Sequence, residues 1–336
     1  DAVYRAACQA FGVAGGWPLT VIMTPAKAPF FITTYLPPHS RYGMQGLDEV
    51  LLSVASAWKT ERKTLLKAGK RIKTFLETQV PVAGEVQVEP ETLLANAAGW
   101  FSRQFDEQNG GFGPAPKFPS AHNLLFLLRS KAGVRLAEKT LKQIYRGGIF
   151  DHIGGGVSRY STDERWLVPH FEKMLYDNAM LAYTYLEAYA ASNQELFALA
   201  ANRILSYLQN ELAAPAGGFY CGQDADSDGV EGKYYVFQNE EIDECLGRER
   251  GESFRKAYGF CEGGNFDGAN IPNLLENAQY ARAFCDFRDE LEKLYAYRLH
   301  RFSLHKDDKI LFSWNGLAFA AFAKAYGVLQ NPEYLL

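Results

Sequence analysis

Helical segments that alternate with glycine-aromatic loops are the feature that most restricts the fold of this chain. Three loops resemble one another: 109–120 (NGGFGPAPKFPS), 147–161 (GGIFDHIGGGVSRYS) and 216–236 (AGGFYCGQDADSDGVEGKYYV). Recurrent helix pairs bury their apolar faces on neighbouring pairs, and an α/α toroid is the natural closed form of such pairs. Apolar spacing predicts helices at 90–105, 120–130, 134–146, 169–191, 194–212, 240–258, 277–299 and 313–329.

The first 80 residues follow a different pattern. A helix is expected at 1–11, strands at 19–23 and 30–35, and a long helix at 47–79. This order of elements is that of the C-terminal half of a thioredoxin fold. At 336 residues the chain exceeds the usual size of a single core. We therefore expect a partial thioredoxin-like α/β domain at 1–80, a linker at 81–90 and a mainly helical, incomplete toroid at 91–336.

Charge and cysteine content exclude several classes of function. A net charge of −4 gives no basic field for nucleic acid. No apolar run is long enough to span a membrane, and no signal-peptide pattern is present, so a cytoplasmic location is expected. The five cysteines include no Cys-x-x-Cys pair, which favours reduced thiols over disulfides or a zinc site. We expect no metal and no cofactor, and the sequence leaves the oligomeric state open.

The densest group of chemically useful side chains lies in 147–189, where glycine clusters flank charged and aromatic residues. Sugar-ring chemistry requires paired acid and base groups, either two carboxylates or His and Glu beside a carbonyl. The candidate catalytic residues are Asp151, His152, His170, Glu172, Asp224, Asp226 and Glu231. The candidate substrate-binding residues are Lys117, Arg159, Tyr160, Trp166, Tyr176, Trp314 and Asn315.

Two physical effects are expected to tune these groups. The helix predicted to start at Pro169 directs its dipole at His170 and Glu172. Repulsion in the acidic loop 224–231 raises the pKa of at least one carboxyl there. A structural explanation stands beside each functional one, since the glycine loops can be connectors, the histidines can satisfy buried carbonyls and the tryptophans can anchor the core.

Two motif matches fail on inspection. DADSDG at 224–229 resembles the start of a calcium loop, but the twelfth position is Tyr235 rather than Glu. GGGVSR at 154–159 follows no predicted strand and opens no helix, so it does not fit a phosphate-binding loop.

Several segments resemble the spermatogenesis-associated protein 20-like family over nearly the whole chain. They are CQAFGVAGGWPLTVIMTPAKAPFFITTYLPP, NGGFGPAPKFP, GGIFDHIGGGVSRYSTDERWLVPHFEKMLYDNAML, DADSDGVEGKYYVF, GNFDGANI and DDKILFSWNGLA. The resemblance implies a thioredoxin-like domain followed by an (α/α)6 toroid similar to six-hairpin glycosidases and N-acylglucosamine 2-epimerases. The family carries its Cys-x-x-Cys-type segment upstream of the first helix, so we expect this chain to be a fragment at both ends.

The same resemblance gives Trp17 and Pro18 a role as the remnant of a redox site. Thioredoxin folds place a cis-proline opposite the redox centre, and Pro18 matches that position, so a cis Trp17–Pro18 bond is predicted. Cys8 lies on the apolar face of the first helix and is expected in the core. Without a partner thiol, no dithiol exchange is expected from this chain.

Three functions remain open at this stage. The first is a carbohydrate-active enzyme, an isomerase, epimerase or hydrolase, in which Asp151, His170, Glu172 and Asp226 converge on one cleft that takes a small sugar-like ligand. The second is a redox protein whose toroid presents clients to the complete thioredoxin-like domain. The third is a non-catalytic binding module. The chain by itself is expected to be inactive both as an enzyme and in redox exchange.

Overall fold

The computed structural model describes residues 2–78 and 89–335. The chain divides into two compact units, Asp1–Gln87 and Val88–Leu336, and each is described by itself. The linker predicted at 81–90 lies almost wholly outside the described residues. None of the helices in the described ranges is long and apolar enough to cross a membrane.

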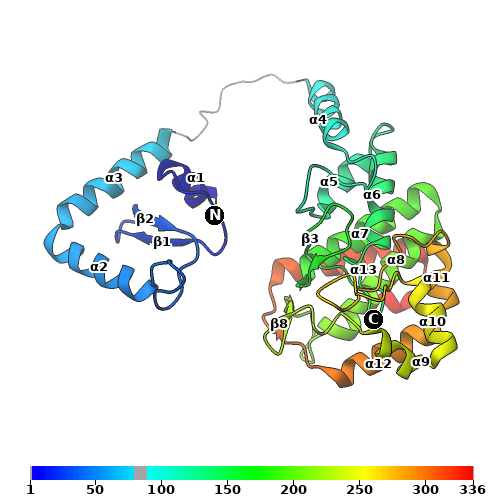
Figure 1. The fold of residues 1–336 in the computed structure, drawn as a ribbon. Coiled ribbons are helices and arrows are strands. Elements are labelled where there is room, and N and C mark those ends of the chain that lie inside the picture. The colour runs from blue at the N-terminus through cyan, green and yellow to red at the C-terminus, as the bar shows by residue number, and fades with distance from the viewer. Residues whose placement is uncertain (1, 79–88, 336) are drawn as a thin grey trace. The chain divides into compact units, whose positions relative to one another are not determined.

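The N-terminal unit holds a two-stranded antiparallel hairpin beside three helices (Figure 1). The elements are α1 (Ala2–Ala10), β1 (Thr20–Met23), β2 (Pro29–Thr33), α2 (Leu47–Thr60) and α3 (Arg62–Thr78). Val21 lies opposite Ile32 in the hairpin. Ala7, Cys8 and Ile32 form the buried core, which places Cys8 in the core as expected. The long helix predicted at 47–79 is two helices, because the chain leaves helical geometry at Glu61.

The peptide bond between Trp17 and Pro18 is cis, as predicted. Trp17 is 66% exposed, and it lines a cavity of about 620 Å³ together with Arg5 and Gln9.

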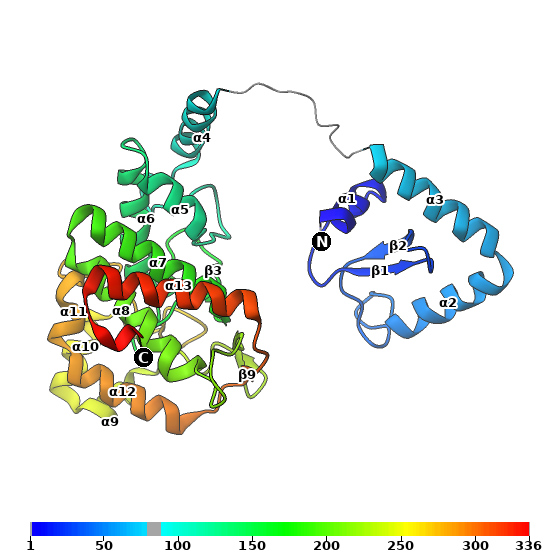
Figure 2. The same cartoon turned by 180° about the vertical axis from the view of Figure 1, so that it is seen from behind.

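The second unit is mainly helical, as predicted for this part of the chain. Its helices are α4 (Pro90–Gln104), α5 (Ala121–Leu128), α6 (Val134–Arg146), α7 (Leu175–Ser192), α8 (Glu195–Tyr207), α9 (Asn239–Leu246), α10 (Arg248–Ala257), α11 (Tyr280–Asp286), α12 (Arg288–Arg301) and α13 (Phe312–Leu329). Short helical turns follow at Leu208–Leu212 and Pro332–Leu335. Helix α7 packs against α5, α8 and α13, so it is the central helix of the unit (Figures 1 and 2).

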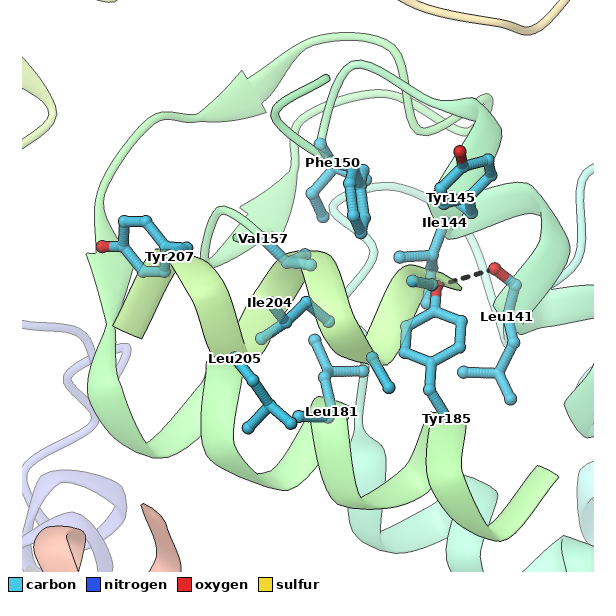
Figure 3. Close-up of a cluster of buried hydrophobic side chains, with 14 of the residues drawn as sticks. Leu141, Ile144, Tyr145, Phe150, Val157, Leu181, Tyr185, Ile204, Leu205 and Tyr207 are labelled. Atoms are coloured by element: carbon cyan, nitrogen blue, oxygen red, sulfur yellow. Dashed lines mark hydrogen bonds between the residues drawn. The ribbon is translucent and has the colours of Figure 1, made fainter. Parts of the chain in front are cut away.

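The core between α7 and α8 is apolar and closely packed (Figure 3). Leu181 and Tyr185 of α7 meet Ile204 and Leu205 of α8, and all four side chains are at most 1% exposed. The Tyr185 hydroxyl donates a hydrogen bond to the Leu141 carbonyl oxygen at 2.8 Å, so its polar end is satisfied inside the core.

Short strands fasten the long loops to one another. They are β3 (Tyr160–Ser161), β4 (Pro169–His170), β5 (Lys173–Met174), β6 (Gly222–Gln223), β7 (Asp226–Ser227), β8 (Val230–Glu231) and β9 (Lys306–Asp307). All the pairs are antiparallel: β3 with β4, β5 with β6, β6 with β9, and β7 with β8. The glycine-rich loops therefore hold a fixed register rather than running free over the surface.

The helix predicted at 169–191 was wrong at its start, because α7 begins only at Leu175. Residues 169–174 are extended, with Pro169, Phe171 and Lys173 buried and the residues between them half-buried. Side chains that alternate in this way belong to a strand. The helix dipole expected to act on His170 and Glu172 is therefore not directed at them.

Two other predicted helices are interrupted. The segment 240–258 is split into α9 and α10 at Gly247, whose φ of +78° ends the first helix. The segment 277–299 is split into α11 and α12 at Phe287.

Candidate functional site

The extended segment 169–174 places His170 and Glu172 on the same side, two residues apart. His170 lies directly opposite Tyr160 in the β3–β4 pair, and the two rings stack with centroids 5.1 Å apart. The Phe118 ring packs on the Tyr160 ring, with the two centroids 4.9 Å apart. Three rings from three segments thus form one aromatic surface.

Two carboxylates flank the His170 imidazole. Its Nδ1 lies 2.7 Å from Glu231 Oε1, and its Nε2 lies 3.7 Å from Glu172 Oε2. Glu172 and Glu231 raise the pKa of His170, against the opposing effect of burial. The imidazole is therefore held as the cation to a higher pH than usual.

Arg159 also fixes Glu172, through the same carboxylate oxygen that lies near His170. The Arg159 guanidinium donates to Glu172 Oε2 at 2.8 Å, and the Arg159 backbone N–H donates to the Glu172 carbonyl oxygen at 2.8 Å. Hydrogen bonding from His170 and Arg159 lowers the pKa of the Glu172 carboxyl, while burial opposes the shift. Glu172 is therefore an ionised group with both of its charge partners in place.

Next to this ion pair lies a cavity of about 250 Å³, which we name the Arg159 cleft. It is lined by Phe118, Pro119, Ser120, Ala121, His122, Arg159, Tyr176, Asp177, Met180 and Leu181. The Tyr176 ring also meets Trp314 of α13 edge to face, with centroids 4.7 Å apart. The cleft lies between the start of α5, the glycine-rich loop 147–161 and the first two turns of α7.

Asp177 is the unusual group of the Arg159 cleft. Its Oδ2 is buried and has no hydrogen-bond partner among the described residues. Burial raises the pKa of Asp177 to about 7, although the Arg159 charge and the Tyr176 hydroxyl act in the opposite direction. The Glu172 carboxylate contributes to the same rise. Near neutral pH, Asp177 is therefore divided between its acid and its carboxylate form.

Sequence analysis assigned no role to Asp177, and it did not identify His122 and Phe118 as lining residues. A signal exists for Phe118 and His122, which flank Ser120 at the end of the loop 109–120. Asp177 is buried by α5 and by the loop that carries Arg159, both of which are distant from it in the sequence. The residues next to Asp177 in the sequence therefore do not indicate that it is buried.

Asp151 lies outside the cleft, in a buried ionic cluster. Its carboxylate accepts two hydrogen bonds from Arg298, at 3.0 and 2.9 Å, and one from Lys173 at 2.7 Å. Lys173 also donates to the Gly155 carbonyl oxygen at 2.7 Å. Burial works against the Asp151 charge, but Arg298 and Lys173 keep the pKa of the carboxyl well below its usual range. The cluster fastens the glycine-rich loop to the extended segment and to α12.

His152 and Trp166 are also parts of the core rather than of the cleft. His152 is packed among aromatic rings, with Nε2 3.2 Å from the Gly147 carbonyl oxygen, and burial lowers its pKa to about 3. The Trp166 indole N–H donates to the Asn109 carbonyl oxygen at 3.0 Å. A Cβ on Gly111 would lie 2.6 Å from the Trp166 ring, so this glycine is needed for close approach.

Lys117 and Asn315 make buried contacts that stabilise loops. The Lys117 ammonium donates to Asp106 at 2.6 Å and to the Gly110 and Glu164 carbonyl oxygens at 2.9 Å each. The Asn315 amide pairs with the Phe219 backbone, accepting at 2.7 Å and donating at 3.0 Å. With all their polar atoms engaged and less than 5% of each residue exposed, neither side chain is placed to contact a ligand.

The acidic loop 224–231 forms a hairpin at the surface. Asp226 and Glu231 are opposite each other in the β7–β8 pair, and both are exposed. Asp224 lies 2.9 Å from His305 instead. The structure thus brings Glu231 to the site through His170 and leaves Asp224 and Asp226 outside the cleft lining. Within 2–78 and 89–335, no group of three metal-ligating side chains is close enough to hold an ion.

Comparison with known proteins matches both parts of the chain. The family described as Thioredox_DsbH, protein of unknown function, DUF255, matches residues 1–77. Spermatogenesis-associated protein 20 of Rattus norvegicus is 35% identical, over 98% of this chain and 48% of that protein. The Homo sapiens protein of the same name is 35% identical, over 100% and 49%. Uncharacterized protein B0495.5 of Caenorhabditis elegans is 32% identical, over 100% and 52%. The chain spans about half the length of these curated relatives.

Solved structures with a similar arrangement are more distant. A sugar epimerase from a ruminal bacterium has a TM-score of 0.35 at 13% identity, over 73% of this chain and 83% of that one. Cellobiose 2-epimerase from Spirochaeta thermophila DSM 6192 has a TM-score of 0.35 at 15% identity, over 74% and 84%. These values are too low to transfer a site or an activity.

Proposed function

This chain belongs to the spermatogenesis-associated protein 20-like family, and we propose that its Arg159 cleft binds a small sugar-like ligand and performs acid–base chemistry on it. The observation that carries the proposal is a pair of carboxyl groups beside one guanidinium, with pKa values displaced in opposite directions. Glu172 is held ionised by His170 and Arg159, whereas burial keeps much of Asp177 protonated. Carboxyls separated in this way are suited to different roles in one reaction.

The composition of the cleft supports a polyhydroxylated ligand. Aromatic rings offer apolar faces for a pyranose ring, and Phe118 and Tyr176 line the cavity. Arg159, Tyr176 and His122 supply polar groups at the same cavity, a combination suited to orienting hydroxyls.

The proposed roles follow from position. Asp177 is the acid–base group, Glu172 is the ionised carboxylate beside it, Arg159 and Tyr176 orient the ligand, and His170 fixes the charge of Glu172. Three further residues contact members of this group. Tyr160 and Glu231 contact His170, and Trp314 contacts Tyr176. Asp151, His152, Lys117, Trp166 and Asn315 are assigned to the scaffold instead.

The lining residues of the cleft all lie between Phe118 and Leu181. The chain itself is therefore a suitable object for the test, in contrast to the expectation that it is inactive alone. The sequence contains no Cys-x-x-Cys pair, and dithiol exchange by the thioredoxin-like unit is therefore not part of the proposed function.

A binding screen tests the proposal. Saturation-transfer NMR with D-glucose, D-mannose, D-galactose, N-acetyl-D-glucosamine and cellobiose is expected to show binding of at least one sugar. Arg159→Gln should abolish that binding, because it replaces the guanidinium by a shorter, neutral amide and so removes the charge that fixes Glu172. Arg165→Gln is the matched control, since Arg165 is 55% exposed and pairs with Glu276 away from the cleft lining. The proposal fails if no sugar binds, or if both variants bind as the parent does.

A further inference from the structure

Resting on the proposed function, we infer that Asp177 is the proton donor of the Arg159 cleft and that its substrate is the cyclic hemiacetal of a reducing monosaccharide. The proton goes to the ring oxygen, and the product is the open-chain sugar. Asp177 would then be a catalytic residue that the sequence motifs do not reveal.

The position of Asp177 supports a donor rather than a salt-bridge role. The side chain lines the cavity, and its buried Oδ2 has no partner among the described residues. A buried carboxylate oxygen without a partner is costly, while a protonated carboxyl avoids the cost of a buried charge. The Arg159 guanidinium, which lines the same cleft, is already hydrogen-bonded to Glu172 at 2.8 Å.

The charged and titratable groups around Asp177 come from four segments of the chain. Arg159 and Glu172 lie on the glycine-rich loop and the extended segment, Tyr176 is on α7 itself, and His122 is on α5. From α13, Trp314 packs on Tyr176 and contributes no charge. Burial outweighs the Arg159 charge in this setting and raises the pKa of Asp177 to about 7. The acid form is therefore available at neutral pH.

The size of the cleft favours one sugar ring. Its volume of about 250 Å³ is below the roughly 300–1,000 Å³ of ordinary ligand pockets. Glycosidic cleavage requires room on both sides of the bond and a second carboxylate that acts on water or on the sugar. Glu172, the other carboxylate nearby, is tied to Arg159 and His170. Ring opening requires space for a single sugar ring and one proton-donating group of the protein.

The step balances without any further reagent. The Asp177 carboxyl gives its proton to the ring oxygen, and the bond from C1 to that oxygen breaks with its electron pair moving to the oxygen. The proton of the C1 hydroxyl passes to water as the C1=O bond forms. The open-chain aldehyde is an isomer of the starting sugar, and the Asp177 carboxylate regains a proton from the solvent.

Mutarotation measured by polarimetry tests the inference. Starting from the pure α-anomers of the sugars that bind, the chain is expected to accelerate mutarotation above the buffer rate. Asp177→Asn should reduce the acceleration by about a hundredfold, or to the background, as expected when a general acid is lost. The acceleration should also fall as the pH rises through about 7, because Asp177 then loses its proton. Asp228→Asn is the control, since Asp228 is 61% exposed and pairs with Lys233.

The outcomes separate this inference from the proposed function. If a sugar binds but mutarotation is not accelerated, or if Asp177→Asn accelerates it as the parent does, the inference is wrong and the binding proposal stands. If no sugar binds, both fail. Asparagine has the size of a neutral carboxyl, and NMR spectra of the variant establish that the fold is retained before the rates are compared.

Discussion

Asp177→Asn is expected to stabilise the helical unit, and to do so more strongly as the pH rises. In the unfolded chain Asp177 loses its proton near the usual pKa of 3.8, whereas in the folded chain it keeps the proton up to about pH 7. Between these values the folded state binds more protons than the unfolded state, so Asp177 lowers the stability progressively as the pH increases. Asparagine has no proton to lose, and it removes this penalty.

The magnitude follows from the interval between the two pKa values. Each unit corresponds to about 1.4 kcal/mol, so the full penalty above pH 7 is about 4 kcal/mol. Most of it arises above pH 5. Relative to the parent, the variant should gain about 3 kcal/mol between pH 5 and pH 8, which is roughly a hundredfold in an equilibrium constant.

Hydrogen exchange of the α7 amides, measured by mass spectrometry, gives the comparison within the helical unit alone. Parent and variant are compared at the same pH, so the intrinsic pH dependence of exchange cancels. Glu107→Gln is a control, because Glu107 is exposed and pairs with Arg135 at the surface. The reasoning is refuted if the variant exchanges at the parent rate at pH 8, or if its advantage is the same at pH 5 and pH 8.

Two substitutions and one titration measurement test the scaffold around the cleft. Asp151→Asn should lower the free energy of unfolding by about 3–5 kcal/mol, because it leaves Lys173 and Arg298 buried without their counter-charge. A loss below about 1 kcal/mol in urea unfolding would contradict this. His152 should remain neutral at pH 5, as seen in its ring ¹⁵N shifts, because burial lowers its pKa to about 3; a protonated ring at that pH would show that it is not in the core. Gly156→Ala should cost at least about 2 kcal/mol, since φ is +77° and the new Cβ would lie 2.6 Å from the Tyr207 ring; thermal unfolding measures it, and an unchanged midpoint would be inconsistent with this geometry.

Helix periodicity predicted most of the helical unit correctly because its apolar faces are long and continuous. The segment expected at 134–146 coincides with α6, which has six buried residues on one face. The interruptions at Gly247 and Phe287 were missed, since a short break leaves the apolar spacing on either side intact.

The segment 169–174 was misjudged because Pro169 is also typical of a first helical turn. An alternating pattern was nevertheless present, with Phe171 and Lys173 inward and His170 and Glu172 outward. Lysine is rarely buried, so Lys173 was not recognised as an inward-facing residue. The strand-like alternation of inward and outward side chains was missed for this reason. The Asp151 counter-charge, 22 residues away, and the Gly155 carbonyl oxygen make this burial possible.

The most conspicuous residues of the sequence form the support of the site rather than the site itself. Lys173 is fixed by Asp151 and by the Gly155 carbonyl oxygen, so the extended segment cannot shift by one residue without exposing the ammonium and burying Glu172. That register directs Glu172 towards Arg159, and it delivers α7 at Leu175 with Asp177 in its first turn. The glycine-rich loop 147–161 therefore determines the geometry of the Arg159 cleft. Substitutions in it should change the cleft by moving Glu172 and Asp177 together.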